Sequence, residues 1–162
     1  MSRVQRLEEL QCCPKNISFK TLIKELSDSA CLLAMDSGIK ATVEGQFENL
    51  QKNLWIDKAI VFNAAENLIA NALRFAKTKI QIGLRVDGET LVLSIQDDGA
   101  GFPQGILQKG PEPFLRADEN NEDGSHFGMG LYVCRLLCEK HNGSLKIQNN
   151  SIGALATAAF KI

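Results

Sequence analysis

Apolar residues recur every third or fourth position in three stretches of the chain, which is the spacing of a helix that buries one face. The first stretch places Leu22, Leu26 and Leu33 on one apolar face. Ser18 before it is a candidate N-cap, and Gly38 after it is a candidate stop. Helices are predicted over about residues 19–37, from the cap Asp57 to about 76, and from about 128 to a stop at 142–143.

Alternation of apolar and polar residues indicates the strands. The clearest strand is predicted at 80–86, and a turn at Asp87-Gly88 joins it to a second alternating segment at 91–95. Further strands are predicted at about 39–47, 54–56, 144–149 and 154–162. The order helix, strands, helix, hairpin, helix, hairpin predicts an α+β sandwich with the helices on one face of a mixed sheet.

Two segments lie outside these patterns. Residues 1–11 are predicted to be the charged end of a helix that stops before Cys12-Cys13-Pro14. Residues 104–127 show no helical or strand period and include an acidic run at 118–123. A loop of this length inside a compact domain is usually functional or disordered.

Composition narrows the class of protein. The 162 residues suffice for one domain with a hydrophobic core, and 44% apolar with 23% charged residues is close to the average for soluble proteins. A net charge of −1 provides no basic surface for nucleic acid, so no such partner is expected. No stretch is apolar enough to span a bilayer and no signal peptide is visible, so we expect a cytoplasmic domain, with any membrane anchor in a longer parent chain.

The five cysteines do not predict a disulfide framework, because their number is odd and Cys12 and Cys13 are adjacent. Cys134 and Cys138 lie four residues apart on an apolar helical pattern. That spacing suits a metal site, but no second pair of ligands completes one. Packing in the core is the favoured interpretation of these two thiols.

The second helix carries an unusual polar line. Asn63, Asn67 and Asn71 recur every fourth residue and Arg74 follows three further on, so the four fall within roughly 80° on the helix. Asparagine is a mediocre helix former, so three asparagines on one helix face indicate a role other than helix stability. Amide oxygens suit a Mg²⁺ ion whose charge is balanced by phosphates, and an arginine can bind phosphate. The alternative is a solvated helix face that happens to be rich in asparagine.

Asp97 follows a strand and precedes Gly99 and Gly101. A carboxylate fixed at a strand end can accept a hydrogen bond from the exocyclic amine of adenine, and glycines beside it let the backbone approach a flat ring. The alternative is an ordinary Asp-Gly turn. Gly128 and Gly130 are predicted to open the third helix, where free backbone N–H groups favour phosphate, although this signal alone is weak.

The order of these features makes the pattern specific. The sequence resembles the GHKL superfamily of ATP-binding domains, and most closely the catalytic domain of sensor histidine kinases. Four segments are similar to the family's N, G1, F and G2 boxes, in that order: 66–76, 97–103, 112–116 and 126–131. The similarity covers about residues 17–162, and residues 1–16 would be the tail of a preceding dimerisation helix with its linker.

The resemblance implies a Bergerat-type two-layer α/β sandwich, with three helices on one face of the sheet and residues 104–127 as an ATP lid. It implies ATP and Mg²⁺ as ligands, with Asn71 as the metal ligand and Asn67 beside the phosphates. Asp97 would bind adenine, and Arg116 would reach the γ-phosphate. The complete implied nucleotide-binding set is Asn67, Asn71, Arg74, Phe75, Asp97, Gly99, Gly101, Phe114, Arg116, Gly128, Met129, Gly130 and Leu131.

One position bears on the reaction. ATP-hydrolysing members of the superfamily carry a glutamate four residues before the metal-binding asparagine, and Asn67 stands there in this chain. Glu66 lies one step away, roughly 100° round the helix, and an amide is no general base. Asn67 and Arg116 are therefore the implied catalytic residues for phosphoryl transfer. The sequence departs from the family at His126, where glycine is common, and at Ala154, which replaces the threonine of the usual Gly-Thr pair.

The resemblance also implies partners. Neither His126 nor His141 begins the phosphoacceptor pattern, so the accepting histidine is expected on a dimerisation domain of the parent kinase. A response-regulator receiver domain would take the phosphoryl group next, and the parent protein is expected to be membrane-anchored. Two other functions stay open: a nucleotide-gated interaction module without transfer, and a GHKL ATPase.

Overall fold

The computed structural model describes residues 3–110 and 122–162. Five strands form a mixed sheet in the order β2-β4-β5-β7-β6, in which β2 and β4 are parallel and the other neighbours antiparallel. Alternation of apolar and polar residues sets the register, because it directs one face of every strand to the core. These strands are β2 (Lys40–Gly45), β4 (Lys79–Asp87), β5 (Thr90–Asp97), β6 (Ser144–Asn149) and β7 (Ala154–Lys161).

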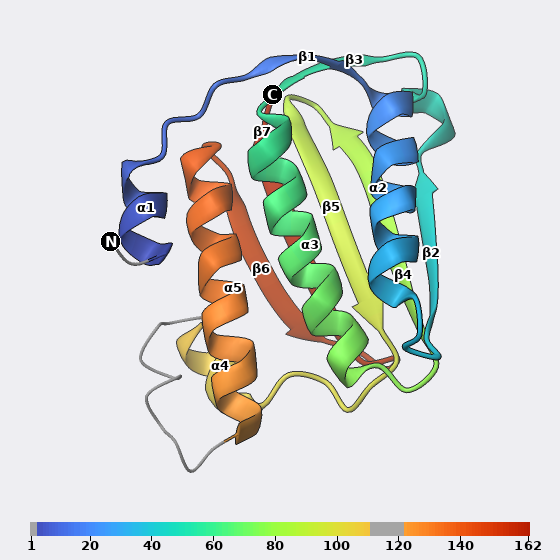
Figure 1. The fold of residues 1–162 in the computed structure, drawn as a ribbon, viewed down its shortest axis with the longest axis vertical. Coiled ribbons are helices and arrows are strands. Elements are labelled where there is room, and N and C mark those ends of the chain that lie inside the picture. The colour runs from blue at the N-terminus through green and yellow to red at the C-terminus, as the bar shows by residue number, and fades with distance from the viewer. Residues whose placement is uncertain (1–2, 111–121) are drawn as a thin grey trace.

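Three long helices cover one face of this sheet, and α3 lies between α2 and α5 (Figure 1). A separate two-stranded sheet pairs β1 (Lys15–Ser18) with β3 (Asn53–Ile56). A 3-10 turn occupies Phe47–Asn49. The helices are α1 (Arg3–Glu9), α2 (Phe19–Ala34), α3 (Lys58–Phe75), α4 (Gln104–Lys109) and α5 (Glu122–Lys140). The predicted α+β class, with three helices on one face of a mixed sheet, is confirmed.

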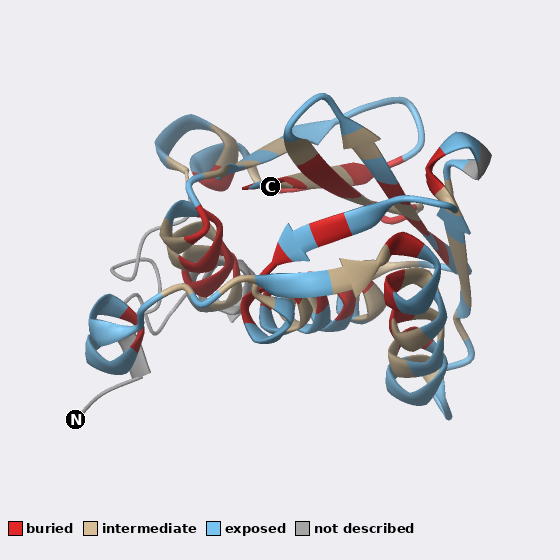
Figure 2. Ribbon diagram, turned by 90° about the horizontal axis from the view of Figure 1, so that it is seen from above, coloured by how far each residue is buried: buried red, intermediate tan, exposed pale blue. Residues whose placement is uncertain are grey.

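The hydrophobic core fills the space between the two layers. In Figure 2 the helices and the five-stranded sheet are seen as separate layers, with buried residues on the surfaces that face each other. Phe19 and Phe160, on α2 and β7, are the largest fully buried side chains. Within the described part of the chain, no helix is both long and apolar enough to cross a membrane.

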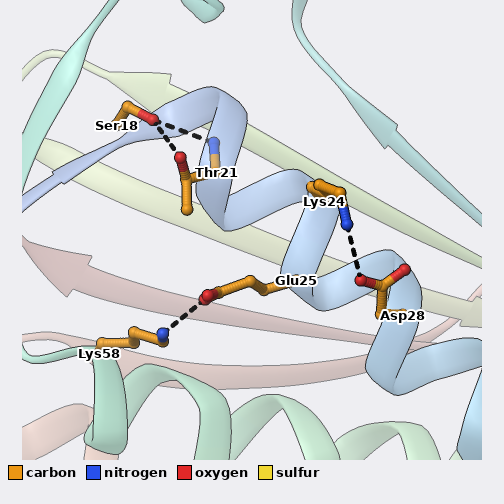
Figure 3. Close-up of polar contacts among 6 residues, drawn as sticks. All are labelled: Ser18, Thr21, Lys24, Glu25, Asp28 and Lys58. Atoms are coloured by element: carbon orange, nitrogen blue, oxygen red, sulfur yellow. Dashed lines mark hydrogen bonds and ion pairs between the residues drawn. The ribbon is translucent and has the colours of Figure 1, made fainter.

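Local contacts fix the position of α2. Ser18 is the predicted N-cap, and its Oγ accepts a hydrogen bond of 3.1 Å from the backbone N–H of Thr21 (Figure 3). Further along, the Lys58 ammonium forms an ion pair of 2.6 Å with Glu25, which joins α2 to the first turn of α3. Figure 3 also shows the exposed pair of Lys24 and Asp28, one turn apart on α2.

Asp57 connects three segments at the start of α3. Its Oδ1 accepts the backbone N–H of Ile60 at 3.2 Å, which confirms the predicted N-cap. Its Oδ2 accepts the backbone N–H of Cys13 at 2.9 Å, and its own N–H donates to Nε2 of His141 at 2.9 Å. The linker after α1, the start of α3 and the end of α5 therefore meet at one residue.

Several predicted boundaries are wrong. The helix predicted from about 128 begins at Glu122, and the segment predicted to lack structure contains α4 at its start. Pro103 precedes α4, Ile106 is buried beneath it, and Gly110 ends it at a φ of +74°, so six residues suffice for a short helix. The helix predicted over 19–37, α2, ends at Ala34, three residues earlier than predicted. Leu33 in its last turn is 39% exposed and does not join the described core.

Candidate functional site

A hollow between two helices gathers the predicted polar stripe. Asn67, Ala70, Asn71 and Arg74 from α3 line it together with Gly130 from α5, around a volume of about 240 Å³. We call this space the α3–α5 hollow. Asn67, Asn71 and Arg74 follow one another at spacings of four and three residues, so their side chains leave α3 on one flank. The predicted grouping of Asn67, Asn71 and Arg74 is thus present in the structure.

Buried packing holds the two walls of the hollow together. The Cys134 thiol on α5 donates a hydrogen bond to the backbone oxygen of Ala64 on α3 at 3.3 Å, and both residues are fully buried. Cys138, one turn later, is also fully buried, and burial raises the pKa of its thiol to about 12. Both cysteines are core residues. No group of three possible metal-binding His, Cys, Asp or Glu side chains occurs within residues 3–110 and 122–162.

Asn63 orients the amide of Asn67. The Asn67 Nδ2 donates to the backbone oxygen of Asn63 at 2.7 Å and to its Oδ1 at 2.9 Å. Because both acceptors are oxygens, the NH₂ end of the Asn67 amide is the end that faces Asn63. The first member of the asparagine stripe therefore positions the second.

Glu66 leaves α3 on a different flank. Its Oε1 accepts a hydrogen bond of 3.4 Å from Oγ of Ser29 on α2, the helix on the opposite side of α3 from α5 (Figure 1). The carboxylate therefore faces away from the α3–α5 hollow and is not among the residues that line it. This agrees with the helical geometry that separates Glu66 from Asn67 in the sequence.

Asp97 is a buried carboxylate at the end of β5, with 5% of its surface exposed. Its Oδ1 accepts two backbone N–H groups, from Gly99 at 2.8 Å and from Ala154 at 3.2 Å. Both of these bonds reach Oδ1, and no donor within residues 3–110 and 122–162 bonds to Oδ2. Burial raises the pKa of this carboxyl, and the two N–H bonds oppose that rise.

The loop after Asp97 packs against the end of α3. A Cβ placed on Gly99 would lie 2.2 Å from the backbone oxygen of Phe75, so only glycine fits there. Gly101 adopts a φ of +93°, and a Cβ on it would lie 2.9 Å from the side chain of Asn149. The end of β5, the C-terminal end of α3 and the turn between β6 and β7 thus lie at the same end of the molecule (Figure 1).

Asp98 closes the neighbouring loop, a role that the sequence did not reveal. Its carboxylate accepts backbone N–H groups from Lys77 at 2.7 Å, from Thr78 at 3.0 Å and from Lys79 at 3.4 Å, and it also accepts the Thr78 hydroxyl. These bonds, that from the Thr78 hydroxyl foremost, hold the pKa of Asp98 well below its usual range. The connection from α3 to β4 is thereby tied to the residue after Asp97.

The turn between β6 and β7 is a second unpredicted part of the site. Asn149 makes reciprocal bonds with Phe102: its Oδ1 accepts the Phe102 N–H at 2.7 Å and its Nδ2 donates to the Phe102 oxygen at 3.0 Å. Asn150 and Gln96 form a further set of contacts beside Asp97. The strands predicted at 144–149 and 154–162 imply a turn here, but only the three adjacent side-chain amides of 148–150 could have marked it as part of the site.

The remaining predicted residues have mixed outcomes. Gly128 and Gly130 lie inside α5 and do not open it, so that prediction is wrong. Interior helical N–H groups bond within the helix, so a phosphate cradle at 128–131 stays a prediction that requires the first turns of α5 to open. Leu131 is fully buried in the core. Phe114 and Arg116 lie outside the described residues, as do the side chains of His126 and Met129.

Known proteins resemble the chain over most of its length. The family model for histidine kinase-, DNA gyrase B-, and HSP90-like ATPases matches residues 56–161. The sensor histidine kinase CpxA of Escherichia coli K12 is 30% identical over 156 residues, which are 96% of this chain and 33% of CpxA. The sensor histidine kinase SpaK of Bacillus subtilis is 27% identical over 136 residues, 83% of this chain and 28% of SpaK. The chain thus spans about a third of the length of these curated relatives.

Solved structures share the fold. The nucleotide-free catalytic domain of histidine kinase ThkA has a TM-score of 0.74 at 19% identity, over 92% of this chain and 96% of that domain. Full-length ShkA in complex with AMPPNP also has a TM-score of 0.74, at 18% identity, over 96% of this chain and 32% of ShkA.

Proposed function

The chain belongs to the family of histidine kinase-, DNA gyrase B- and HSP90-like ATPases, and from this premise we propose that it binds ATP with Mg²⁺ and donates the γ-phosphoryl group to a histidine on another domain. The named relatives that resemble it are sensor histidine kinases. The chain is therefore a catalytic domain of the histidine kinase type, and transfer to a histidine is the specific activity that we propose for it.

The α3–α5 hollow is the observation that carries this proposal. It brings two amide side chains, Asn67 and Asn71, together with the cation of Arg74. Triphosphate oxygens need positive charge, which Arg74 supplies. Asn71 is the proposed metal ligand, because a neutral amide oxygen suits a Mg²⁺ ion whose charge the phosphates already balance. When bound, Mg²⁺ would neutralise charge on the transferring phosphates.

Asp97 supports the choice of an adenine nucleotide. A buried acceptor oxygen favours a ligand with an N–H donor, and the exocyclic amine of adenine is such a donor. Gly99 and Gly101 let the loop beside this carboxylate pack closely, since a Cβ on Gly99 would meet the Phe75 backbone oxygen and one on Gly101 the Asn149 side chain. The proposed base site at the end of β5 lies at the same end of the molecule as the last turn of α3, which carries Arg74 (Figure 1).

The position of Glu66 supports transfer over hydrolysis. Hydrolysis requires a general base that removes a proton from water, and the Glu66 carboxylate faces α2 instead. In the proposed reaction a neutral imidazole nitrogen attacks the γ-phosphorus, an N–P bond forms, and the bond from phosphorus to the β,γ-bridging oxygen breaks. ADP leaves with that electron pair, and the imidazole releases its ring N–H proton. Positioning and charge stabilisation supply most of the catalysis of such a step.

The proposed partners follow from this reaction. The accepting histidine would belong to a dimerisation domain of the parent kinase, and a response-regulator receiver domain would take the group afterwards. His141 cannot serve as the acceptor, because it is 2% exposed and its Nε2 already accepts the Asp57 N–H. We propose that the domain works on the cytoplasmic side of a membrane-anchored parent protein.

Mixing the chain with the histidine-bearing domain of its parent tests the proposal. We expect γ-labelled ATP to label that histidine when wild-type chain and Mg²⁺ are present. Asn71→Ala should abolish the labelling, and Glu66→Ala, from the opposite flank of the same helix, is the matched control that should retain it. Nucleotide binding without labelling would favour an interaction module, and steady phosphate release by the isolated chain would favour an ATPase.

A further inference from the structure

Gln96 is the residue before Asp97 on β5, and its side chain lies beside the start of β7. Its Nε2 donates to the backbone oxygen of Asp97 at 2.7 Å and to that of Ala154 at 3.2 Å. Two carbonyl oxygens can only accept, so the NH₂ end of the Gln96 amide must face them. Its Oε1 consequently faces the other way, toward the turn between β6 and β7.

Asn150 completes the arrangement from that turn. Its Nδ2 donates to Oε1 of Gln96 at 2.6 Å. Its Oδ1 accepts the backbone N–H groups of Ile152 and Gly153, each at 3.0 Å. Backbone oxygens fix the orientation of the Gln96 amide, and backbone N–H groups fix that of the Asn150 amide. The hydrogen bond between the two side chains joins the turn to the end of β5.

The turn between β6 and β7 packs directly against Asp97. Gly153 packs so closely that a Cβ on it would lie 2.6 Å from the Asp97 backbone oxygen and 2.9 Å from its Oδ1. The next residue, Ala154, directs its N–H to the same Oδ1 at 3.2 Å. The backbone pairing of β5 with β7 ends at Gln96 and Leu155, so on the β5 side the contacts that reach Ala154 and the turn come from the side chains of Gln96 and Asp97, while β6 pairs with Ala154 from the other side.

We infer that Gln96 and Asn150 are positioning residues for base selection: they hold the Ala154 N–H on Oδ1 of Asp97, so that Oδ2 alone is left to bind the base. The inference rests on the proposed ATP site at Asp97. Neither residue touches the nucleotide in this arrangement. They act through the turn 150–153, which they fix against the strand end.

The chemistry of the bases explains why one occupied oxygen matters. Adenine presents a single exocyclic amine, which one carboxylate oxygen accepts. Guanine presents an oxygen at the equivalent position, but it also offers a ring N–H and an amine side by side, which a carboxylate with two available oxygens can accept together. With Oδ1 of Asp97 taken by Gly99 and Ala154, the paired contact is blocked. The arrangement therefore selects adenine over guanine.

The test compares Mg²⁺-dependent binding of ATP and GTP to the whole chain by calorimetry. Gln96→Met keeps the volume of the side chain and removes its donors, and Asn150→Ala removes the partner in the exposed turn. Gln81→Ala and Ser151→Ala are the matched controls, because both residues are exposed and lie on the adjacent strand and in the same turn. Melting curves without nucleotide show that each variant is folded.

We expect each positioning variant to lower the ratio of ATP to GTP affinity about tenfold, the size of one hydrogen bond to a charged group. ATP affinity should fall and GTP affinity should stay level or rise, while both controls keep the wild-type ratio. An equal loss of affinity for both nucleotides would show a structural role only and overturn the inference. An unchanged ratio in both variants would also overturn it.

The experiment distinguishes failure of the proposed ATP site from failure of the role proposed for Gln96 and Asn150. If the wild-type chain binds no nucleotide at all, the ATP site is wrong and the inference falls with it. If the wild type prefers ATP and the Gln96→Met and Asn150→Ala variants keep that preference, only the role of the two amides is wrong. Should Gln96→Met fail to fold, Asn150→Ala alone decides the question, because Asn150 is exposed and outside the core.

Discussion

Oγ of Ser29 on α2 donates a hydrogen bond of 3.4 Å to Oε1 of Glu66 on α3. The contact directs the only acidic side chain of α3 toward α2, whereas the asparagine stripe lines the hollow toward α5. An acid that faces a neighbouring helix cannot take a proton from water held beside Asn71. The packing of α3 between two helices therefore separates this carboxylate from the proposed chemistry.

The first prediction concerns Glu66. Glu66→Ala should leave phosphoryl transfer within about twofold of the wild type, because the lost bond is exposed and weak. Asn67→Ala, one residue further on, should lower transfer strongly, since its amide lies in the hollow. Single-turnover labelling of the histidine domain measures both. A loss of transfer in Glu66→Ala that equals the loss in Asn67→Ala would contradict the assignment.

The second prediction separates ligand binding from folding at Asn71. Ligand that binds only the native state raises stability by about 2.7 kcal/mol at one hundred times its Kd. Thermal melting of the wild type should show this gain with Mg-ATP, and Asn71→Ala should lose most of it. Its melting temperature without nucleotide should stay near the wild-type value, because Asn71 is only partly buried. Unfolding of Asn71→Ala would instead mean that the asparagine stripe is structural.

The third prediction sets stability against recognition at Asp97. The amide oxygen introduced by Asp97→Asn can still accept the N–H groups of Gly99 and Ala154. The substitution also removes a buried charge. We therefore expect an unchanged or higher melting temperature together with weaker discrimination between ATP and GTP. Wild-type discrimination in Asp97→Asn would remove this residue from the base site.

The Asp97 carboxyl should also make ATP binding depend on pH. Burial raises the pKa of Asp97, so its carboxyl becomes protonated at a higher pH than an exposed aspartate. A protonated Oδ2 donates and no longer accepts, which weakens adenine binding. ATP affinity should thus fall on acidification starting above about pH 4, the ordinary carboxyl range. Asp97→Asn should lack this dependence, and calorimetry across pH 4–8 measures it.

Local signals predicted most of the fold. Ser18 and Asp57 both cap helices as expected, because a capping side chain acts on residues only three positions away. The strands follow from alternation along one segment. The strand β1 was missed because it has four residues and pairs with β3, so that Ile17 lies opposite Leu54 far along the chain. No local pattern marks such a pair.

The same distinction holds for the site. Asn67 and Asn71 were predicted to meet because one helix carries both. The contacts of Asp97 with Ala154 and of Asp98 with Thr78 join residues 57 and 20 positions apart, and only the folded sheet brings them together. The start of α5 was placed too late because the glycines at 128 and 130 are poor helix formers, and the helix continues through them.

A further prediction concerns acid stability at Asp98. The native pKa lies well below the unfolded value, so this group stabilises the fold fully above the ordinary carboxyl range of about 4 and loses that contribution as pH falls below it. Asp98→Asn should therefore be less stable than the wild type at pH 7, and the difference should shrink as both are acidified below about pH 4. Urea unfolding at pH 7, 5 and 3 measures it. A difference that is constant with pH would contradict the electrostatic origin.

The last prediction concerns His141, whose Nε2 accepts the Asp57 N–H at 2.9 Å while its ring meets Phe160 edge-on at 5.7 Å between centroids. His141→Phe preserves the ring and leaves the Asp57 donor without its partner, so stability should fall by about 1–3 kcal/mol. The urea midpoint should drop with an unchanged slope, because the surface exposed on unfolding stays the same. The folded variant should still label the separate histidine domain, because His141 contacts Asp57 before the first turn of α3, whereas Arg74 lies in the last turn of that helix. Label on His141 itself in the wild type would contradict both its burial and its structural role.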